Sequence, residues 1–141
     1  MLALGDTSEQ ASQRLPNLLE QHNPVLALVT LGGNDMLRHI PEQQTIANLE
    51  RILTLFKAHG AKPVLLATPN PMRAVFQNLS APDFYRKLAE AQHVPLIEDA
   101  FADVLSDPKL KGDALHPNAE GHVRLAENIF KELQSIGYAG L

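Results

Sequence analysis

Two short, nearly continuous apolar runs constrain the fold of this chain most. They span residues 24–31 (PVLALVTL) and 63–68 (PVLLAT). Neither alternates apolar with polar residues, which is typical of strands buried on both faces of a parallel sheet. A third, shorter strand is expected at residues 94–97. Because helical patterns separate these runs, the sequence predicts an α/β fold with right-handed crossovers.

The first predicted helix has two possible capping boxes at its start. Either Asp6 pairs with Glu9, or Thr7 pairs with Gln10. Farther along, Pro16 lacks the N–H that the interior of a helix needs. Pro16 is therefore expected to break or restart this helix.

The later helices are predicted from apolar residues that recur at helical spacing. We expect them at residues 42–59, 82–92, 100–105 and 118–135, with loops at 69–82 and 106–117. The residues expected to face inward from the last helix are Val123, Ala126, Ile129, Phe130 and Leu133. At 141 residues, the chain is long enough for one domain with a real core, which we assign to residues 1–141.

Composition excludes several classes of function. A net charge of −4 and the lack of a basic stripe argue against a nucleic-acid partner. The absence of cysteine excludes disulfides, thiol catalysis and cysteine-ligated metals. No apolar run approaches the roughly 20 residues that span a bilayer. The six histidines show no metal-ligand spacing, and no Gly-rich phosphate-binding motif is present, so neither a cofactor nor a metal is predicted.

A polar cluster, Gly32-Gly33-Asn34-Asp35, directly follows the first apolar run. Ligands of α/β sheets bind beyond the carboxyl ends of strands, and this cluster lies at such an end. The glycines allow a sharp turn, and Asn34 offers an amide donor to an oxyanion, typically worth ~3 kcal/mol in a transition state. A simple strand-ending turn would use the same residue types. Asp35 is expected to be structural and to bond loop amides.

A second cluster, Asp113 and His116, lies in the loop before the last helix. Three residues apart on a loop, the carboxylate can accept a hydrogen bond from one imidazole nitrogen. The other nitrogen is then free to act as a general base. The alternative is a helix-start turn with a solvated acid and an incidental histidine, which Pro117 would also suit.

Together the two clusters resemble conserved blocks of the SGNH (GDSL-type) hydrolase superfamily of esterases, thioesterases and lysophospholipases. Residues 32–35 match its third block, and residues 113–117 match the Asp-x-x-His-Pro of its fifth. The resemblance implies a flavodoxin-like three-layer α/β/α sandwich. It also implies an oxyanion donor at Asn34 and a catalytic acid–base pair formed by Asp113 and His116.

The nucleophilic serine of that family is not evident. Its Gly-Asp-Ser-Leu motif follows the first strand, whereas the only Gly-Asp here is Gly5-Asp6, followed by Thr7 and Ser8. Only four residues precede Gly5, too few for a central strand and its turn. Between Gly5 and Gly32 there is room for only one helix and one strand, so Gly5-Asp6-Thr7-Ser8 resembles the family's second block instead. The resemblance then gives Gly5 an oxyanion-hole N–H and makes residues 1–4 the tail of the second strand. Thr7 or Ser8 would be the nucleophile if Gly5-Asp6 belonged to the first block, but both residues also fit a structural role as helix caps.

The serine, the first strand and the first helix are therefore expected upstream of residue 1, so that the chain is an N-terminally incomplete domain. The expected activity is hydrolysis of acyl esters or thioesters by a Ser-His-Asp triad. The alternative is a truncated remnant that binds or assembles without turnover. An apolar acyl group could bind against three residues that border the predicted site: Met36, Leu37 and Met72. Ordinary loop packing is the alternative for the same residues.

Loss of the first strand has a physical consequence for residues 25–31. One edge of that strand would lack a partner. The chain is accordingly expected to be destabilised or to form a homodimer through that edge. Many members of the family that the chain resembles are exported, so the resemblance favours a periplasmic or secreted protein.

Overall fold

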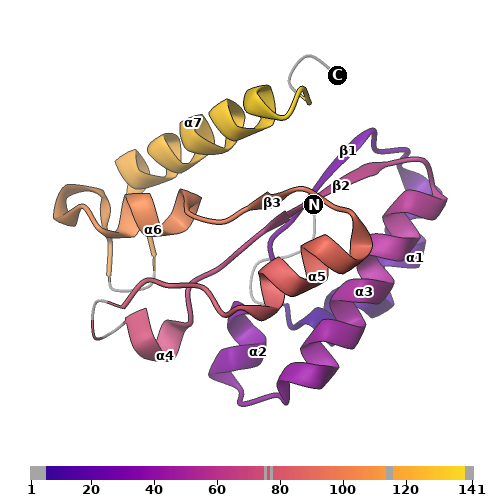
Figure 1. Ribbon diagram of the computed structural model, residues 1–141, viewed down its shortest axis with the longest axis horizontal. Coiled ribbons are helices and arrows are strands. Elements are labelled where there is room, and N and C mark those ends of the chain that lie inside the picture. The colour runs from indigo at the N-terminus through magenta and orange to yellow at the C-terminus, as the bar shows by residue number, and fades with distance from the viewer. Residues whose placement is uncertain (1–5, 75, 77, 114–115, 139–141) are drawn as a thin grey trace.

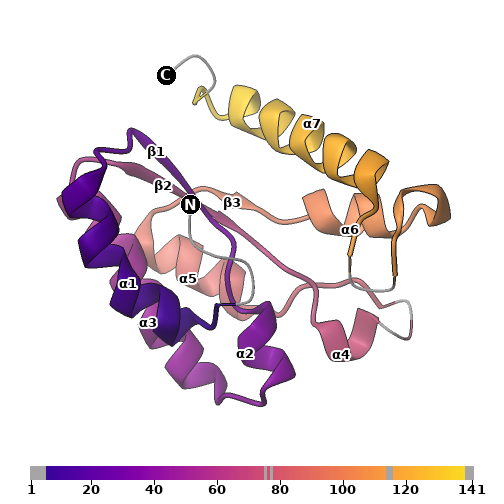
Figure 2. The ribbon, with the colours of Figure 1, turned by 180° about the vertical axis from the view of Figure 1, so that it is seen from behind.

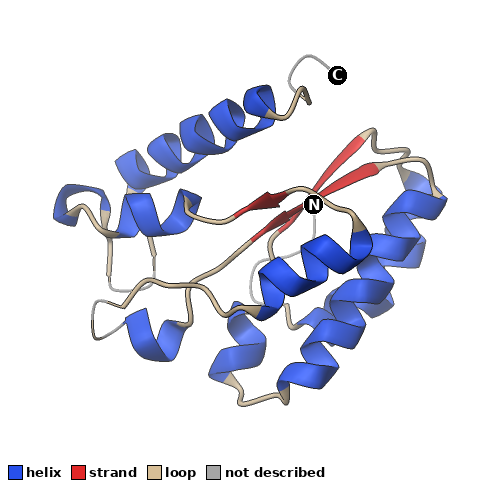
Figure 3. Cartoon of the chain, viewed as in Figure 1, coloured by secondary structure: helices blue, strands red, loops and turns tan. Residues whose placement is uncertain are grey.

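A parallel sheet organises the computed structural model, which describes residues 6–74, 76, 78–113 and 116–138. Within these residues the sheet has three strands in the order β1 (Leu26–Val29), β2 (Lys62–Leu66) and β3 (Leu96–Ile97). β1 pairs with β2 from Leu26 opposite Lys62, and β2 pairs with β3 from Leu65 opposite Leu96. The predicted parallel α/β arrangement is thus confirmed (Figure 3).

Helices cover both faces of the sheet and make three layers (Figures 1 and 2). One face carries α1, α3 and α5, and the other carries α6 and α7. The helices are α1 (Ser8–Gln21), α2 (Gly33–Leu37), α3 (Glu42–Ala58), α4 (Pro71–Ala74), α5 (Phe84–Gln92), α6 (Ala100–Leu105) and α7 (Ala119–Ser135), with a 3₁₀ turn at Pro108–Leu110.

The predicted burial on both faces is right for β2 and wrong for β1. In β2, Leu65 packs against the α1–α3–α5 side and Val64 against the α6–α7 side, and both are fully buried. In β1, by contrast, the side chain of Leu28 is 44% exposed. The α6–α7 cluster includes residues of β2 and β3 but from β1 only the partly buried Leu26. Burial of β1 on both faces was therefore a wrong prediction.

The edge of β1 matches the expectation from sequence. Among the described residues β1 pairs with β2 alone, so its opposite edge has no strand partner. Such an edge presents unpaired backbone N–H and C=O groups that can template pairing with another strand.

The start of α1 resolves the choice between the two capping boxes. Thr7 caps the helix: its hydroxyl accepts from Gln10 N at 3.3 Å and its N–H donates to Gln10 Oε1 at 2.9 Å. Pro16 does not break the helix, contrary to prediction. Leu15 and Leu19 are buried on either side of it, so packing outweighs the one helical hydrogen bond that proline removes.

The inward face of α7 is rotated relative to the prediction. Leu133 is buried as expected, but Leu125 is buried too, whereas Val123 and Phe130 are exposed. Gly121 lies on the buried face of the helix and allows a close approach there. A Cβ built there would lie 2.1 Å from the carbonyl oxygen of Leu110, so the helix can approach that turn only through a residue without a side chain.

The segment 69–82, predicted to be a loop throughout, contains the short helix α4. Pro71 begins it, where the missing N–H costs no helical hydrogen bond. No helix in the described residues is long and apolar enough to cross a membrane.

Candidate active site at the carboxyl ends of the strands

The turn after β1 places Asn34 in the first turn of α2. Gly32 precedes that helix with a φ of 117°, which only glycine adopts readily. A Cβ at Gly32 would also lie 2.3 Å from the hydroxyl oxygen of Tyr85. Asn34 is half-buried, and its side chain makes no hydrogen bond to the described part of the chain. Its amide is therefore available to a ligand.

Asp35 is an internal anchor, as its expected structural role requires. Its carboxylate is almost fully buried and accepts three hydrogen bonds. The donors are Ser8 N at 2.7 Å, Ser8 Oγ at 2.5 Å and Thr45 Oγ1 at 2.7 Å. Asp35 thus ties α2 to the first turn of α1 and to α3, and it fixes the helix that carries Asn34.

The same network determines what Ser8 and Thr7 can do. Ser8 is fully buried, donates its hydroxyl proton to Asp35 and accepts a hydrogen bond from Asn48 Nδ2 at 3.1 Å. Thr7 is buried and caps α1. Both hydroxyls therefore have structural partners, and neither is presented to a substrate.

Asp113 and His116 meet in the loop before α7. His116 Nδ1 lies 3.0 Å from Asp113 Oδ1 and 3.2 Å from Oδ2, and the backbone N–H of His116 donates to Oδ1 at 3.0 Å. Because a carboxylate can only accept, Nδ1 carries the proton and Nε2 is left as the acceptor of a neutral imidazole. Both side chains are exposed. This is the pairing that the sequence predicted.

Local backbone bonds hold this loop. Gly112 N donates to the carbonyl of His116 at 2.9 Å, and Lys111 and Pro117 form an antiparallel bridge. Asn118 then caps α7 by accepting from Gly121 N at 2.8 Å and donates to the carbonyl of Lys109 at 2.8 Å. These bonds fix the start of α7 and, with it, the end of the loop that carries His116.

The remaining predicted residues are placed as follows. Gly5 lies outside the described residues, as do residues 1–4. Met36 is half-buried on α2, Leu37 is exposed at its end, and α4, which carries the exposed Met72, packs against α2. In Figure 1, α2, α4 and the start of α7 lie on the side of the sheet where the strands end.

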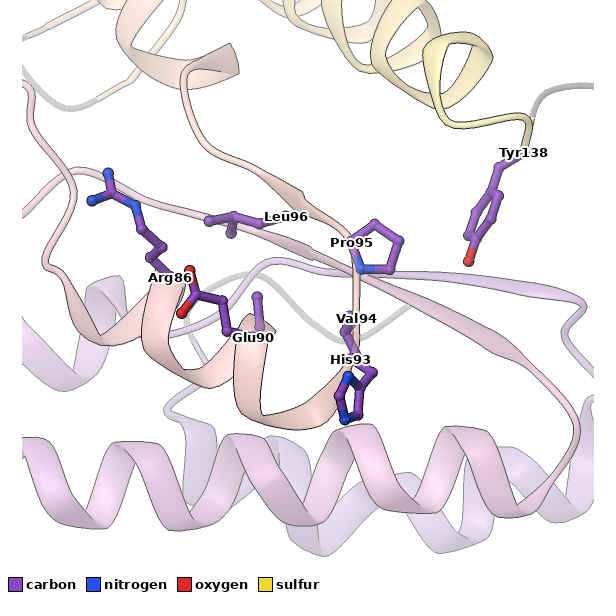
Figure 4. A pocket seen from close by; sticks show the side chains of 8 residues that line it. Arg86, Glu90, His93, Val94, Pro95, Leu96 and Tyr138 are labelled. Carbon is purple, nitrogen blue, oxygen red and sulfur yellow. The ribbon is translucent and has the colours of Figure 1, made fainter.

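Two surface hollows in the described structure lie elsewhere. One, of about 570 Å³, is lined by residues of α5, by the segment leading into β3 and by Tyr138 (Figure 4). The other, of about 460 Å³, lies between α5 and α6 and is bordered by Asp83, Asp99 and Asp103. Neither contains a predicted site residue. No group of three or more histidine or acidic residues in the described chain could hold a metal ion.

One polar contact at the site was not anticipated from the sequence. The hydroxyl of Tyr85 donates to the carbonyl of Leu31 at 2.6 Å and lies 2.7 Å from Thr68 Oγ1. Burial raises the pKa of this phenol well above its ordinary value, despite the opposing hydrogen bond from Thr68. Leu31 and Tyr85 are 54 positions apart, so no local pattern could have joined them.

Comparisons with known proteins agree with this geometry. Residues 4–124 match the GDSL-like lipase/acylhydrolase family. The chain is 40% identical over 136 residues to thioesterase 1/protease 1/lysophospholipase L1 of Escherichia coli K12, covering 94% of this chain and 64% of that protein. It is 37% identical to the arylesterase of Vibrio mimicus, covering 92% and 66%. The chain thus spans just under two thirds of the length of these relatives.

Solved structures show the same fold. The esterase EstA from Pseudoalteromonas sp. superposes with a TM-score of 0.79 at 25% identity, covering 94% of this chain and 73% of that one. The structure of TesA gives a TM-score of 0.75 at 28% identity, covering 94% and 74%. The resemblance predicted from the two polar clusters is confirmed at the level of the family.

Proposed function

Because the chain belongs to the GDSL-like lipase/acylhydrolase family, we propose that it supplies most of the active site of a serine hydrolase acting on acyl esters or thioesters. The observation that carries this proposal is the contact between His116 Nδ1 and Asp113 at 3.0 Å, on a loop beside the strand ends. The relatives are named as a thioesterase and lysophospholipase and as an arylesterase, which are acyl-transfer activities.

In the proposed mechanism His116 moves the protons. Its Nε2 accepts the proton of a serine hydroxyl as the serine oxygen bonds to the substrate carbonyl carbon. It then passes that proton to the leaving alcohol or thiol as the ester bond breaks. A water molecule repeats the two steps on the acyl-enzyme and releases the acid. Asp113 holds the imidazole in the Nδ1–H tautomer and stabilises the imidazolium that forms in each step.

Asn34 would stabilise the negative oxygen that develops on the substrate carbonyl. Its amide is free of hydrogen bonds to the described chain, and it lies on a helix anchored from both sides. A donor fixed before the reaction avoids reorganisation in the transition state. The N–H of Gly5 and that of the serine itself would complete the oxyanion hole.

We propose that the nucleophilic serine comes from a segment preceding residue 1, together with a first strand and a first helix. Three observations support this. Ser8 and Thr7 have structural partners. The edge of β1 has no strand partner among the described residues, and Leu28 of that strand is exposed on the side of α6 and α7. A strand–helix unit would cover both. On this proposal, residues 1–141 form one N-terminally incomplete domain.

The acyl group would lie along the seam of α2 and α4. Leu37 and Met72 are 44% and 49% exposed there, and Met36 is half-buried beside them. A hydrocarbon chain that covers these side chains removes apolar surface of both from water, which makes binding more favourable.

The test replaces His116 by alanine in a version of the protein extended upstream through the serine. The ester turnover number should fall by about 10³-fold or more, because the general base is lost. His122→Ala is the matched control: it is a second exposed histidine six residues away, and it should leave turnover unchanged. Full turnover by the His116→Ala variant would end the proposal.

A second candidate function is assembly without turnover. The observation that favours it is the edge of β1 that has no strand partner among the described residues. We propose that the chain alone pairs two copies through this edge, in antiparallel register about a two-fold axis. Sedimentation equilibrium would then show a dimer, and Leu28→Lys should shift it toward monomer. A stable monomer at high concentration would refute the proposal.

A further inference from the structure

Tyr85 occupies a particular place in the fold. It is the second residue of α5 and is 1% exposed, with its ring stacked on Phe84 at a centroid distance of 4.2 Å. Its hydroxyl reaches the point where the carboxyl ends of β1 and β2 approach each other. There it meets the carbonyl of Leu31 at 2.6 Å and Thr68 Oγ1 at 2.7 Å.

The direction of these bonds follows from the groups involved. A carbonyl oxygen can only accept, so the single phenolic proton goes to Leu31. Thr68 must then donate its own proton to the phenolic oxygen. Both hydrogen-bonding roles of the hydroxyl are thus used, and it joins Leu31, the residue before Gly32, to Thr68, two residues beyond the end of β2.

Gly32 and Tyr85 are sterically matched. Gly32 has a φ of 117°, and a Cβ on it would lie 2.3 Å from the phenolic oxygen. The hydroxyl therefore fills the space that any other residue at position 32 would need, and it bonds to the peptide that enters the turn. Gly32 in turn starts α2, since its carbonyl accepts from Met36 N at 3.1 Å.

Asn34 lies between this contact and the buried carboxylate of Asp35. Tyr85 fixes the peptide on one side of Asn34, and Asp35, held by Ser8 and Thr45, fixes the residue on the other. The Asn34 side chain has no hydrogen bond to the described chain, so its direction is set by the backbone that these two anchors hold.

We propose that Tyr85 is a positioning residue for ester hydrolysis: its hydroxyl, bonded to the Leu31 carbonyl, holds the turn that aims the amide of Asn34 at the oxyanion. The inference rests on the function proposed above. It assigns to α5, which carries no catalytic group, a part in the geometry of the oxyanion hole. A displaced donor loses transition-state binding more than ground-state binding, so the effect belongs in kcat.

The kinetic test uses Tyr85→Phe in the version of the protein extended through the serine. We expect kcat to fall by about 10- to 100-fold with KM within about twofold, since removing an oxyanion donor outright costs about 10²- to 10³-fold. In an Asn34→Ala background the same change should cost less than about twofold, because the donor that it positions is gone. A full additional loss in that background, or an unchanged kcat, would overturn the inference.

A control separates positioning from weakened folding. Leu88 lies one turn farther along α5 and is 3% exposed, so Leu88→Ala loosens the same helix without touching the hydroxyl. It should leave kcat unchanged well below the melting temperature. A loss in Leu88→Ala equal to that in Tyr85→Phe would mean that only the stability of α5 matters.

A second measurement needs no activity and uses the 141-residue chain. Hydrogen exchange at the Met36 amide, which bonds to the Gly32 carbonyl, reports how firmly the turn is held. Tyr85→Phe should speed exchange there by about tenfold relative to amides in the middle of α3, as expected for local opening. Unchanged exchange would refute the anchoring of the turn by Tyr85. Inactivity of the extended wild-type protein would instead refute the proposed function and would leave this exchange measurement valid.

Discussion

The two halves of the proposed site are held in opposite ways. The turn that carries Asn34 is buried, and side chains from α1, α3 and α5 converge on it through Asp35 and Tyr85. The loop that carries Asp113 and His116 is exposed and is held by bonds among neighbouring residues. The turn therefore depends on the whole fold. The loop depends on its own backbone, so changes there should alter chemistry without altering stability.

The largest expected effect compares two aspartates. Asp35→Ala leaves three buried donors without an acceptor and should lower the free energy of unfolding by about 3–5 kcal/mol. Asp113→Ala removes an exposed carboxylate and should change it by less than about 0.5 kcal/mol. Urea unfolding of both variants measures the difference, and similar losses would show that the loop is as integral to the fold as the turn.

A pair of glycines tests the close packing of the turn. Gly32 and Gly60 both have positive φ, but a Cβ at Gly60 would meet nothing within 4 Å, whereas one at Gly32 meets Tyr85. Gly60→Ala should cost about 1 kcal/mol from backbone strain. Gly32→Ala should cost about 2–4 kcal/mol, because strain and overpacking add. Equal losses in thermal unfolding would contradict the steric match with Tyr85.

Alkaline pH offers a third comparison. Burial raises the pKa of Tyr85, so the folded chain holds the phenolic proton more tightly than the unfolded chain. The resulting stabilisation is present in full below the unfolded value of about 10, and it is lost as pH rises toward the folded value, at up to about 1.4 kcal/mol per pH unit. In urea unfolding between pH 9 and 11, the free energy of unfolding should decline more steeply with pH for wild type than for Tyr85→Phe. Parallel declines would contradict this.

The smallest expected effect is on the loop itself. His116→Ala should change the free energy of unfolding by less than about 0.5 kcal/mol, since the hydrogen bond between these two exposed side chains contributes little to stability. The same variant is expected to lose nearly all turnover in the extended protein. A melting temperature several degrees lower would show that the imidazole also supports the fold.

Much of the fold was readable from local patterns. The positions of the strands, the helix start near Thr7 and the pairing of Asp113 with His116 each depend on residues close together in sequence. Tertiary contacts decided the rest. Pro16 is tolerated because leucines around it are buried, and α7 buries Gly121 against the Leu110 carbonyl, a contact that helical periodicity does not predict. The contact of Tyr85 with Leu31 joins segments that share no local pattern.

The exposed face of β1 teaches the same lesson. An apolar run predicts burial on both faces, but burial also needs an element to cover each face. Leu28 is 44% exposed because α6 and α7 lie over β2 and β3. The sequence predicted that a strand lies here, but not which of its faces would be covered.

The measurement that tests the account most directly is labelling with a fluorophosphonate probe, followed by mass spectrometric location of the adduct. We expect no adduct on the 141-residue chain. A version extended upstream should carry one adduct, on a serine that precedes residue 1, and His116→Ala should abolish it. An adduct on Ser8 of the 141-residue chain would contradict the account, because the hydroxyl that the structure shows bonded to Asp35 would then be the nucleophile.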